Sequence, residues 1–197
     1  RKKKEGEKSV IRFVMELKEV TFEDLVRGPI TFNTALSGDI VIAKDITTPL
    51  YNFSVVIDDA EMHITHIIRG EDHISNTPKQ ILLQEALGFE RPLYAHLPLI
   101  LGEDRTKLSK RHGDFSVTRF REAGYLPEAL SNFLALLGWN PGTEEEIFPL
   151  SALCKEFSFG RVQKSGAVFT IKRLDWINGF YLRQKSPSTL AELCIPF

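Results

Sequence analysis

A helix with clear start and stop signals, set among short apolar runs, limits the folds open to this chain more than any other pattern. Thr77 is predicted to cap a helix that has Pro78 at its first position, and the apolar-rich segment that follows stops at Gly88. Short apolar runs lie on both sides of this helix, at residues 53–57, 63–68 and 97–101. Because such runs are typical of strands buried on both faces, we predict parallel strands joined by a right-handed crossover through the helix.

The segment before this unit is predicted to be rich in strands and turns. Residues 10–15 and 40–43 are short β-branched or apolar runs, which are typical of strands. Glycine-containing turns are expected at residues 27–29 and 37–39.

The last part of the chain is predicted to be helical. One helix is expected to begin at Pro127 and end at Gly138. Its apolar residues recur at the spacing of a single buried helix face, and they are Leu130, Phe133, Leu134 and Leu137. Ser151 and Thr170 are candidate N-caps of two further short helices.

Composition excludes several classes of function. The net charge is −1, so nucleic-acid contacts must come from local basic patches rather than from the field of the whole chain. There is no apolar run of about 18 residues that would predict a membrane span, and the basic N-terminus lacks the apolar stretch of a signal peptide. Cys154 and Cys194 lack metal-ligand spacing, so we expect buried free thiols in a reducing cytoplasm. His63 and His66 would point to opposite faces of a strand, so no shared metal ion is expected.

The stretch ILGEDRTKLSKRHGDFS, residues 100–116, is predicted to be a loop, because it contains two glycines and a cluster of charges. It holds Lys107, Ser109 and Lys110 close together. Ammonium groups at this spacing suit the charge that develops when a nucleophile attacks a phosphate and a polyphosphate leaves. The alternative is a solvated basic loop, since basic clusters are common and uninformative by themselves.

Three long segments favour the phosphate-binding interpretation of this loop over a solvated basic loop. They are IIRGEDHISNTPKQILLQEALGF, YAHLPLILGEDRTKLSKRHG and GYLPEALSNFLALLGW. Together they resemble glutamyl-tRNA synthetases of the bacterial or organellar type, and the resemblance covers residues 10–183. The KLSKR segment resembles the KMSKS signature of class I aminoacyl-tRNA synthetases, with Leu108 in the methionine position and Arg111 in the last. The HIGH signature of this family is absent from the sequence. We therefore expect an internal piece of a longer enzyme, inactive by itself.

The resemblance implies an α/β fold, in which the second half of a class I nucleotide-binding, Rossmann-like fold is followed by a helical stem-contact domain. Residues 1–50 are expected to end an acceptor-stem-binding insertion, and residues 51–104 to form the second half of the nucleotide-binding catalytic domain. Residues 105–197 are expected to hold the KLSKR loop and the stem-contact domain.

The resemblance also implies roles for individual residues. Tyr51 and Arg69 are expected to bind glutamate, Arg69 through the side-chain carboxylate; the alternative for Arg69 is an ion pair with Glu71 or Asp72. The residues expected to contact ATP are Asp72, His73, Leu99, Ile100, Lys107, Ser109 and Lys110. Lys107 and Lys110 are the expected catalytic residues, stabilising the α-phosphate and the leaving pyrophosphate. Mg²⁺ is expected on ATP, without a protein-bound metal.

The activity implied for the parent is ATP-dependent conversion of glutamate to glutamyl-adenylate and its transfer to the 3′ end of tRNA(Glu). The parent is expected to be a cytoplasmic monomer whose partners are ATP, glutamate and tRNA(Glu), with no membrane. Arg119, Arg121 and the basic residues in 164–173 are candidate tRNA-backbone contacts, or else a solvated helix face. Two other functions stay open: a non-catalytic tRNA-binding remnant, and a truncated paralogue that glutamylates a modified base in tRNA.

Overall fold

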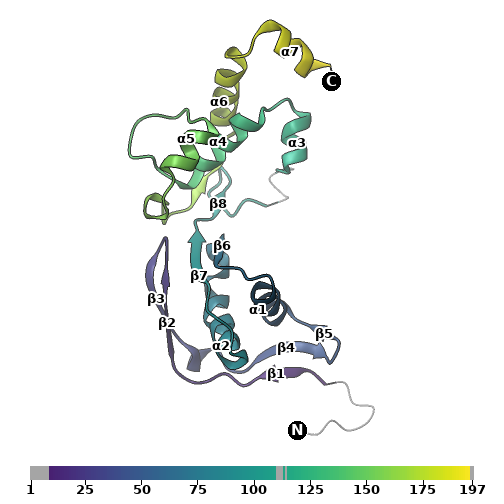
Figure 1. The fold of residues 1–197 in the computed structure, drawn as a ribbon, viewed down its shortest axis with the longest axis vertical. Coiled ribbons are helices and arrows are strands. Elements are labelled where there is room, and N and C mark those ends of the chain that lie inside the picture. The colour runs from purple at the N-terminus through teal and green to yellow at the C-terminus, as the bar shows by residue number, and fades with distance from the viewer. Residues whose placement is uncertain (1–8, 110–112, 114, 196–197) are drawn as a thin grey trace. The chain divides into compact units, whose positions relative to one another are not determined.

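The computed structural model describes residues 9–109, 113 and 115–195, and it divides into two compact units (Figure 1). The first unit is Arg1–His96 and the second is Leu97–Phe197. The division predicted from the sequence, at residues 50 and 104, concerns function and stays a prediction.

Within its described residues, the first unit contains two sheets, two α-helices and two 3₁₀ helices. Its strands are β1 (Ile11–Phe13), β2 (Glu19–Asp24), β3 (Gly28–Asn33), β4 (Ile40–Asp45), β5 (Thr48–Pro49), β6 (His66–Gly70) and β7 (Leu93–Leu97). Its helices are η1 (Thr34–Leu36), α1 (Tyr51–Glu61), η2 (Glu71–Asn76) and α2 (Thr77–Leu87), of which η1 and η2 are 3₁₀ helices. One sheet has the order β1-β4-β5 and the other β3-β2-β7-β6. β2 is antiparallel to β3 and parallel to β7.

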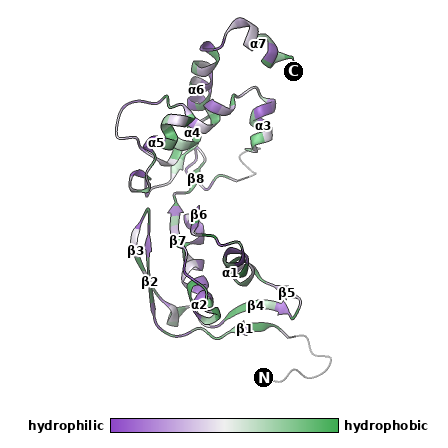
Figure 2. Cartoon of the chain, viewed as in Figure 1, coloured by the Kyte–Doolittle hydropathy of each residue, from purple (hydrophilic) through white to green (hydrophobic). Residues whose placement is uncertain are grey.

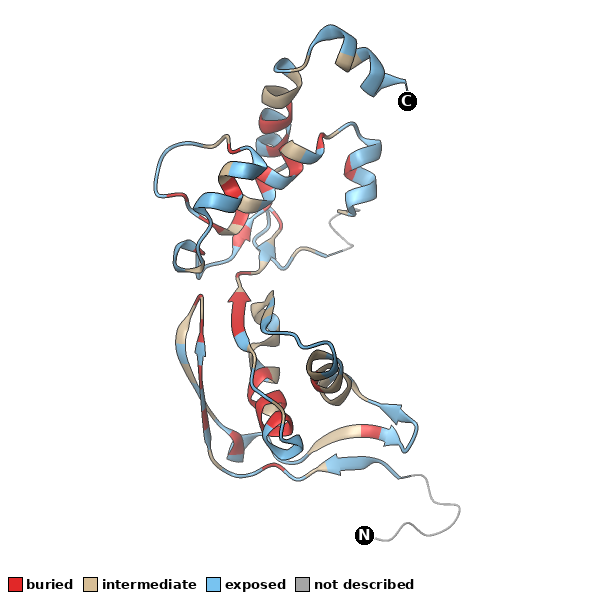
Figure 3. Cartoon of the chain, viewed as in Figure 1, coloured by how far each residue is buried: buried red, intermediate tan, exposed pale blue. Residues whose placement is uncertain are grey.

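Alternation along β2 builds the core of the first unit. Side chains of a strand point to opposite faces in turn, and in β2 the buried ones are Val20, Phe22 and Asp24. Val20 and Phe22 pack with Ile81, Leu82 and Tyr94. Figure 3 shows buried positions concentrated on β7 and α2. By contrast, Figure 2 shows β1 as hydrophobic, although Figure 3 shows it exposed.

The predicted helix is confirmed. It is α2, although Asn76 rather than Thr77 occupies the N-cap position and Thr77 is the first helical residue. Pro78 lies in its first turn, and Gly88 after its last residue has the left-handed φ of 71° that glycine adopts without strain. The predicted turns around Gly28 and Gly38 are also confirmed, since both have positive φ. Strands at 10–15 and 40–43 are confirmed as β1 and β4.

Two of the three predicted central strands are corrected. Residues 53–57 lie in helix α1, where Val56 is the buried residue, because a short apolar run cannot be distinguished from a helix segment by its pattern. Residues 97–101 do not form one strand, since β7 ends at Leu97 and β8 begins only at Ile100. Pro98 lies between them and has no N–H to donate to a sheet. The run at 63–68 contains the start of β6, which is a sheet neighbour of β7.

The second unit is mainly helical. Its strands are β8 (Ile100–Leu101) and β9 (Ala167–Val168), which pair in parallel. Its helices are α3 (Val117–Glu122), α4 (Pro127–Gly138), α5 (Leu150–Glu156), η4 (Phe159–Arg161, a 3₁₀ helix), α6 (Ile171–Arg183) and α7 (Pro187–Cys194). Phe169 forms ring contacts with Phe115, Phe120 and Phe133 at the centre of its core.

The predicted helix over residues 127–138 is confirmed as α4, but not every apolar position faces the core. Leu130, Phe133 and Leu137 are buried, whereas Leu134 is 44% exposed. Thr170 occupies the N-cap position of α6, although its side chain forms no capping hydrogen bond. The prediction of Ser151 as an N-cap is wrong, because Pro149 precedes α5 and Ser151 lies inside it.

The cysteine prediction is partly wrong. Cys154 and Cys194 are free, but both are exposed rather than buried. Each lies near the end of a short helix, and these helices cover little of the core. Within the described ranges of the chain, no helix is long and apolar enough to cross a membrane.

Candidate active site

Arg69 is held at the end of β6 by three hydrogen-bonding groups. Its Nε donates to His96 Nε2 at 3.2 Å, and its Nη2 donates to Thr77 Oγ1 at 2.8 Å. Nη2 also lies 3.5 Å from the backbone carbonyl oxygen of His73. The guanidinium carbon lies 5.8 Å from the ring centre of Tyr94, within the range of a cation–π contact. The side chain is half-buried and fixed along one edge.

This geometry gives no support to the alternative in which Arg69 is paired with Glu71 or Asp72. Within the described part of the chain, the hydrogen bonds of Arg69 go to His96, Thr77 and the His73 carbonyl. Glu71 forms its ion pair with Arg27, from the turn between β2 and β3. All the hydrogen-bond partners of Arg69 are therefore uncharged groups or, for His96, an imidazole.

Behind Arg69 lies a buried pair, Asp24 and His96. His96 Nδ1 is 2.6 Å from Asp24 Oδ2, and both side chains are fully buried. Asp24 also accepts hydrogen bonds from the backbone N–H groups of Val26 at 3.0 Å, Arg27 at 2.9 Å and His96 at 3.1 Å. Burial alone would raise the pKa of Asp24, but these hydrogen bonds hold that pKa below its ordinary value.

The imidazole of His96 is kept neutral. Burial lowers the pKa of His96, and this effect exceeds the opposing one of its hydrogen bond and charge interaction with Asp24. The positive charges of Arg69 and Arg27 lower it further. A neutral imidazole has one N–H and one acceptor nitrogen, which matches a donor to Asp24 and an acceptor from Arg69.

Tyr51 and His73 lie beside each other in the same unit. Tyr51 begins helix α1, rather than a strand as predicted, and its hydroxyl lies 3.4 Å from His73 Nδ1. Asn76 Nδ2 lies 3.3 Å from the same nitrogen. The two rings are 5.6 Å apart, and 49% of Tyr51 is exposed. The structure thus brings Tyr51, His73 and Arg69 together, since the carbonyl of His73 also faces Arg69.

Asp72 lies in η2 with an exposed side chain. Its carboxylate folds back over Gly70, so that a Cβ added to Gly70 would lie 2.5 Å from Asp72 Oδ1. Glycine at this position therefore allows the observed direction of the Asp72 side chain. A carboxylate can accept hydrogen bonds from sugar hydroxyls.

In the second unit, Lys107 follows a tight turn after β8. Lys107 lies opposite Leu101 in an antiparallel bridge, and Leu108 N donates to the carbonyl of Ile100 at 2.8 Å. Arg105 has a left-handed φ of 60° at the turn, where Asp104 accepts hydrogen bonds from Thr106. Residues 100–108 of the predicted loop therefore form a short hairpin extending from β8.

The side chains of this hairpin divide into an anchor and an exposed pair. Leu108 packs against the helical core of the second unit, while Lys107 and Ser109 are exposed. Ile100 is 39% exposed, and the carbonyl of Leu99 accepts a hydrogen bond from Ala167 N at 2.9 Å. Lys110, the other expected catalytic residue, lies outside the described residues.

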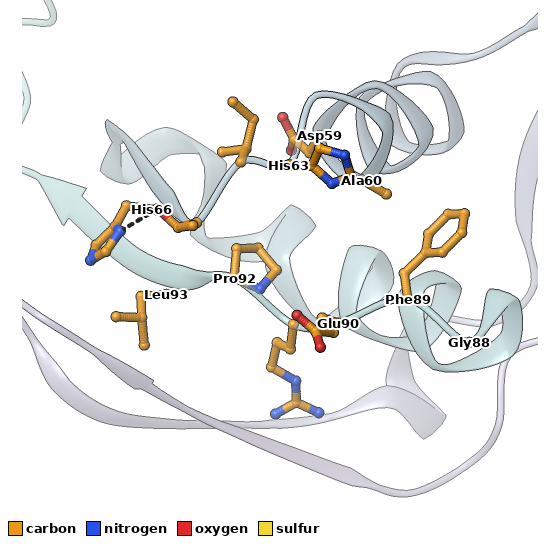
Figure 4. Close-up of a pocket in the computed structure, with 12 residues that line it drawn as sticks. Asp59, Ala60, His63, His66, Gly88, Phe89, Glu90, Pro92 and Leu93 are labelled. Carbon is orange, nitrogen blue, oxygen red and sulfur yellow. Dashed lines mark hydrogen bonds between the residues drawn. The ribbon is translucent and has the colours of Figure 1, made fainter.

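A cavity of about 550 Å³ opens elsewhere in the first unit (Figure 4). The residues that line it include Asp59, His63, His66, Glu90, Arg91 and Leu93. It contains none of the predicted substrate-binding residues. His63 follows α1 and His66 begins β6, and His66 Nδ1 lies 2.9 Å from Thr65 Oγ1. Among the described residues, no group of three or more His, Cys, Asp or Glu side chains could hold a metal ion.

The sequence analysis missed Asp24, His96 and Thr77 as neighbours of Arg69. One signal was available: Asp24 follows Val20 and Phe22 at a spacing of two residues, which places a carboxylate on the buried face of a strand. A buried carboxylate requires a partner. The candidate tRNA-contacting residues Arg119 and Arg121 are exposed on α3, and Arg173 forms an ion pair with Glu146 at 2.9 Å.

Comparison with known protein families gives one clear result. The family model described as "tRNA synthetases class I (E and Q), catalytic domain" matches residues 1–176. Glutamate–tRNA ligase of Carboxydothermus hydrogenoformans is 56% identical over 194 residues, which cover 98% of this chain and 40% of that protein. Glutamate–tRNA ligase of Aquifex aeolicus is 57% identical over 197 residues, which cover 98% of this chain and 42% of that protein. The chain thus spans about two fifths of the length of these curated relatives.

Solved structures give a matching result for the fold. The crystal structure of a glutamate tRNA ligase from Elizabethkingia meningosepticum, in complex with its amino acid, has a TM-score of 0.83 and 40% identity. That match covers 91% of this chain and 40% of the other. The crystal structure of glutamate-tRNA synthetase from Elizabethkingia anophelis has a TM-score of 0.84 and 37% identity, over 93% of this chain and 41% of the other. The predicted α/β class and its relation to class I synthetases are confirmed.

Proposed function

Because the chain belongs to the class I tRNA synthetases of the E and Q type, we propose that the whole protein is a glutamate–tRNA ligase. It activates glutamate with ATP to glutamyl-adenylate and transfers the glutamyl group to the 3′ end of tRNA(Glu). We expect it to act in the cytoplasm, with ATP, Mg²⁺ carried by ATP, glutamate and tRNA(Glu) as its partners. The observation that supports this function best is the environment of Arg69.

Arg69 is suited to bind a carboxylate. No carboxylate of the described residues is hydrogen-bonded to it, and Asp59 interacts with it through charge alone. Its Nη1 forms no hydrogen bond to any residue within the described ranges, while Nε and Nη2 are fixed by His96 and Thr77. A charge-assisted bond from a held guanidinium is stronger than one between neutral groups, and it selects a carboxylate over an amide. We assign Arg69 to the side-chain carboxylate of glutamate, with Tyr51 beside it.

The remaining roles divide between the two units. In the first unit, we assign Asp72 and His73 to contacts with ATP, Asp72 through the ribose hydroxyls. In the second, Leu99 and Ile100 contribute an apolar and backbone surface for adenine, and Ser109 donates to phosphate. Lys107 and Lys110 stabilise the negative charge that develops as the glutamate carboxylate attacks the α-phosphate and pyrophosphate leaves. The reaction needs no covalent enzyme intermediate, because positioning and electrostatic stabilisation are sufficient.

Substitution of Arg69 by lysine tests the central assignment in the whole ligase. Lysine keeps the charge but cannot hold the planar array of donors, so the KM for glutamate should rise about 30- to 150-fold, the loss of roughly 2–3 kcal/mol expected for one charge-assisted contact. The KM for ATP should change little, and the preference for glutamate over glutamine should fall. An Arg69→Lys enzyme that keeps its amino-acid preference but loses thermal stability and ATP affinity together would refute the assignment.

A further inference from the structure

The buried pair Asp24 and His96 does not belong to the proposed substrate contacts, yet His96 is hydrogen-bonded to Arg69 and Asp24 is hydrogen-bonded to His96. Asp24 is 2% exposed and His96 is 0% exposed, so neither side chain is open to a ligand. They come from β2 and β7, which are neighbours in the sheet. Burial of an ionised carboxylate is costly unless it is fully hydrogen-bonded. Asp24 accepts hydrogen bonds from His96 Nδ1 and from three backbone N–H groups.

The hydrogen-bond donors and acceptors fix the protonation of His96. Arg69 can only donate, so His96 Nε2, at 3.2 Å from Arg69 Nε, must carry a lone pair. Asp24 is ionised and can only accept, so His96 Nδ1, at 2.6 Å, must carry the proton. The order of donation is therefore Arg69 to His96 to Asp24. A charged imidazole does not satisfy this order.

Thr77 completes the same arrangement from the start of α2. Its hydroxyl accepts from Arg69 Nη2 at 2.8 Å, which leaves its proton for His96 Nε2 at 3.2 Å or for the His73 carbonyl at 3.4 Å. Thr77 is fully buried, so its position is fixed by packing. Arg69 is consequently held at two of its three nitrogens by buried groups.

We propose that Asp24 and His96 are positioning residues for glutamate recognition: they hold Arg69 by its Nε so that Nη1 is presented to the substrate carboxylate, and they do so only while His96 is neutral. This proposal rests on the proposed function, in which Arg69 binds glutamate. Neither residue touches the substrate. Their effect reaches it through the direction of the guanidinium.

Protonation of His96 would turn Nε2 from an acceptor into a donor facing the Arg69 donor, and it would place a second positive charge against the guanidinium. The charged or titratable groups facing His96 are Asp24 from β2, Arg27 from the turn after β2, Arg69 from β6 and Tyr94 from its own strand. α2 presents Thr77, which does not titrate in this range. Asp24 is the one negative charge among these groups, and it faces Nδ1 rather than Nε2.

Two substitutions of His96, measured in the whole ligase, test the proposal. His96→Gln places an amide oxygen near the Nε2 position and cannot titrate, whereas His96→Phe keeps a buried ring but removes the acceptor. His96→Phe should raise the KM for glutamate about tenfold or more, since a misdirected guanidinium loses most of its contact, and should leave the KM for ATP nearly unchanged. His96→Gln should restore most of the glutamate affinity. Gln80→Leu is the matched control, because Gln80 is buried in the same unit and bonds to Asn52 rather than Arg69.

The pH profile separates positioning from a merely structural role. In the wild type, the KM for glutamate should rise on acidification while the KM for ATP does not follow it; in His96→Gln the glutamate profile should be flatter. Equal changes in both KM values in His96→Phe, accompanied by the same loss of melting temperature as in Gln80→Leu, would overturn the proposal. The Arg69→Lys variant separates failure of the positioning proposal from failure of the proposed function. If Arg69→Lys raises the KM for glutamate and His96→Phe does not, the positioning proposal fails while the proposed function stands. If Arg69→Lys leaves glutamate recognition unchanged, the proposed function itself fails.

A direct measurement is available on the chain itself. The ¹⁵N shifts of the His96 ring in the folded chain should show a neutral imidazole with its proton on Nδ1 at neutral pH. In Asp24→Asn this preference should weaken, because the amide no longer requires a donor. If the folded wild-type chain shows a charged ring, or a proton on Nε2, the proposed order of hydrogen bonds is excluded.

Discussion

The Arg69 site and the Lys107 hairpin hold their cations in opposite ways. Arg69 is half-buried and bonded to two fully buried side chains, His96 and Thr77, with Asp24 behind them. Lys107 is exposed on a turn whose apolar anchor is Leu108. The proposed roles explain the difference. Selecting a carboxylate over an amide requires a fixed direction of donors, whereas stabilising charge on a phosphate requires a nearby point charge.

The largest expected difference between the two regions is in the free energy of unfolding lost when a carboxylate is removed from each. Asp24→Ala should destabilise the chain by about 3–5 kcal/mol, because it leaves a buried imidazole and three backbone N–H groups without their acceptor. Asp104→Ala, which removes the acceptor of Thr106 on the exposed turn, should cost about 1 kcal/mol or less. Chemical denaturation of both variants measures the two values. Similar costs would mean that the Asp24 network does not stabilise the first unit.

Lys107→Ala should lower the rate of glutamate activation while leaving the stability of the chain nearly unchanged. Its rate of glutamate activation in the whole ligase should fall about a hundredfold or more, which corresponds to roughly 3 kcal/mol for one oriented charge. The free energy of unfolding of the chain should change by less than about 0.5 kcal/mol, as is usual at exposed positions. Single-turnover activation and denaturation measure these effects, with Lys44→Ala on β4 as an exposed-lysine control. Normal activation by the Lys107 variant would exclude its catalytic role.

Gly70→Ala tests the role of the Asp72 side chain, because Gly70 lies between Arg69 and Asp72 in the sequence. The new Cβ would lie 2.5 Å from Asp72 Oδ1, so the Asp72 side chain must turn away. Since the backbone at Gly70 is extended, with φ −65° and ψ 149°, alanine adds no backbone strain there. The KM for ATP should rise by less than about tenfold, as expected for one displaced hydrogen bond, with the KM for glutamate preserved. If ATP affinity is unaffected, Asp72 does not contact the nucleotide.

A smaller effect is expected in the pH dependence of stability. The folded pKa of His96 lies below its ordinary value, so between the two values the unfolded chain binds more protons. The stability that neutral His96 contributes to the folded chain is therefore present above the ordinary histidine pKa of about 6.5, and it is lost as the pH falls through the pKa of the folded state. Denaturation between neutral and mildly acidic pH should show a shallower decline for His96→Gln than for the wild type. The control Gln80→Leu, which removes no titratable group, should follow the wild-type slope.

The sequence predicted elements that depend on local signals. Helix α2 was predictable because Pro78 and Gly88 mark its ends chemically, and α4 because its apolar residues recur at helical spacing. Residues 53–57 were assigned to the wrong element because β-branched residues favour strands, while packing of α1 against α2 decides the outcome here. The strand at 97–101 was misplaced because the apolar run crosses Pro98 without a visible break in hydrophobicity.

The candidate site was only half predictable for a similar reason. Arg69 and Lys107 lie within long recognisable segments, so the sequence could nominate them. Their surroundings depend on residues that are distant in the chain. Asp24 and His96 are 72 positions apart, and only the placement of β2 beside β7 makes them a pair. The hydrogen bond between them has no local sequence signature.

The most direct test of the account is a double-mutant cycle for glutamate recognition. The apparent free energy of glutamate binding, from the KM for activation, is compared among wild type, Arg69→Lys, His96→Phe and the double variant. If His96 acts through the direction of the guanidinium, the double variant should be about as impaired as Arg69→Lys alone, with a coupling of about 1 kcal/mol or more. If the two losses simply add, within about 0.5 kcal/mol, His96 does not act through Arg69 and the central claim is contradicted.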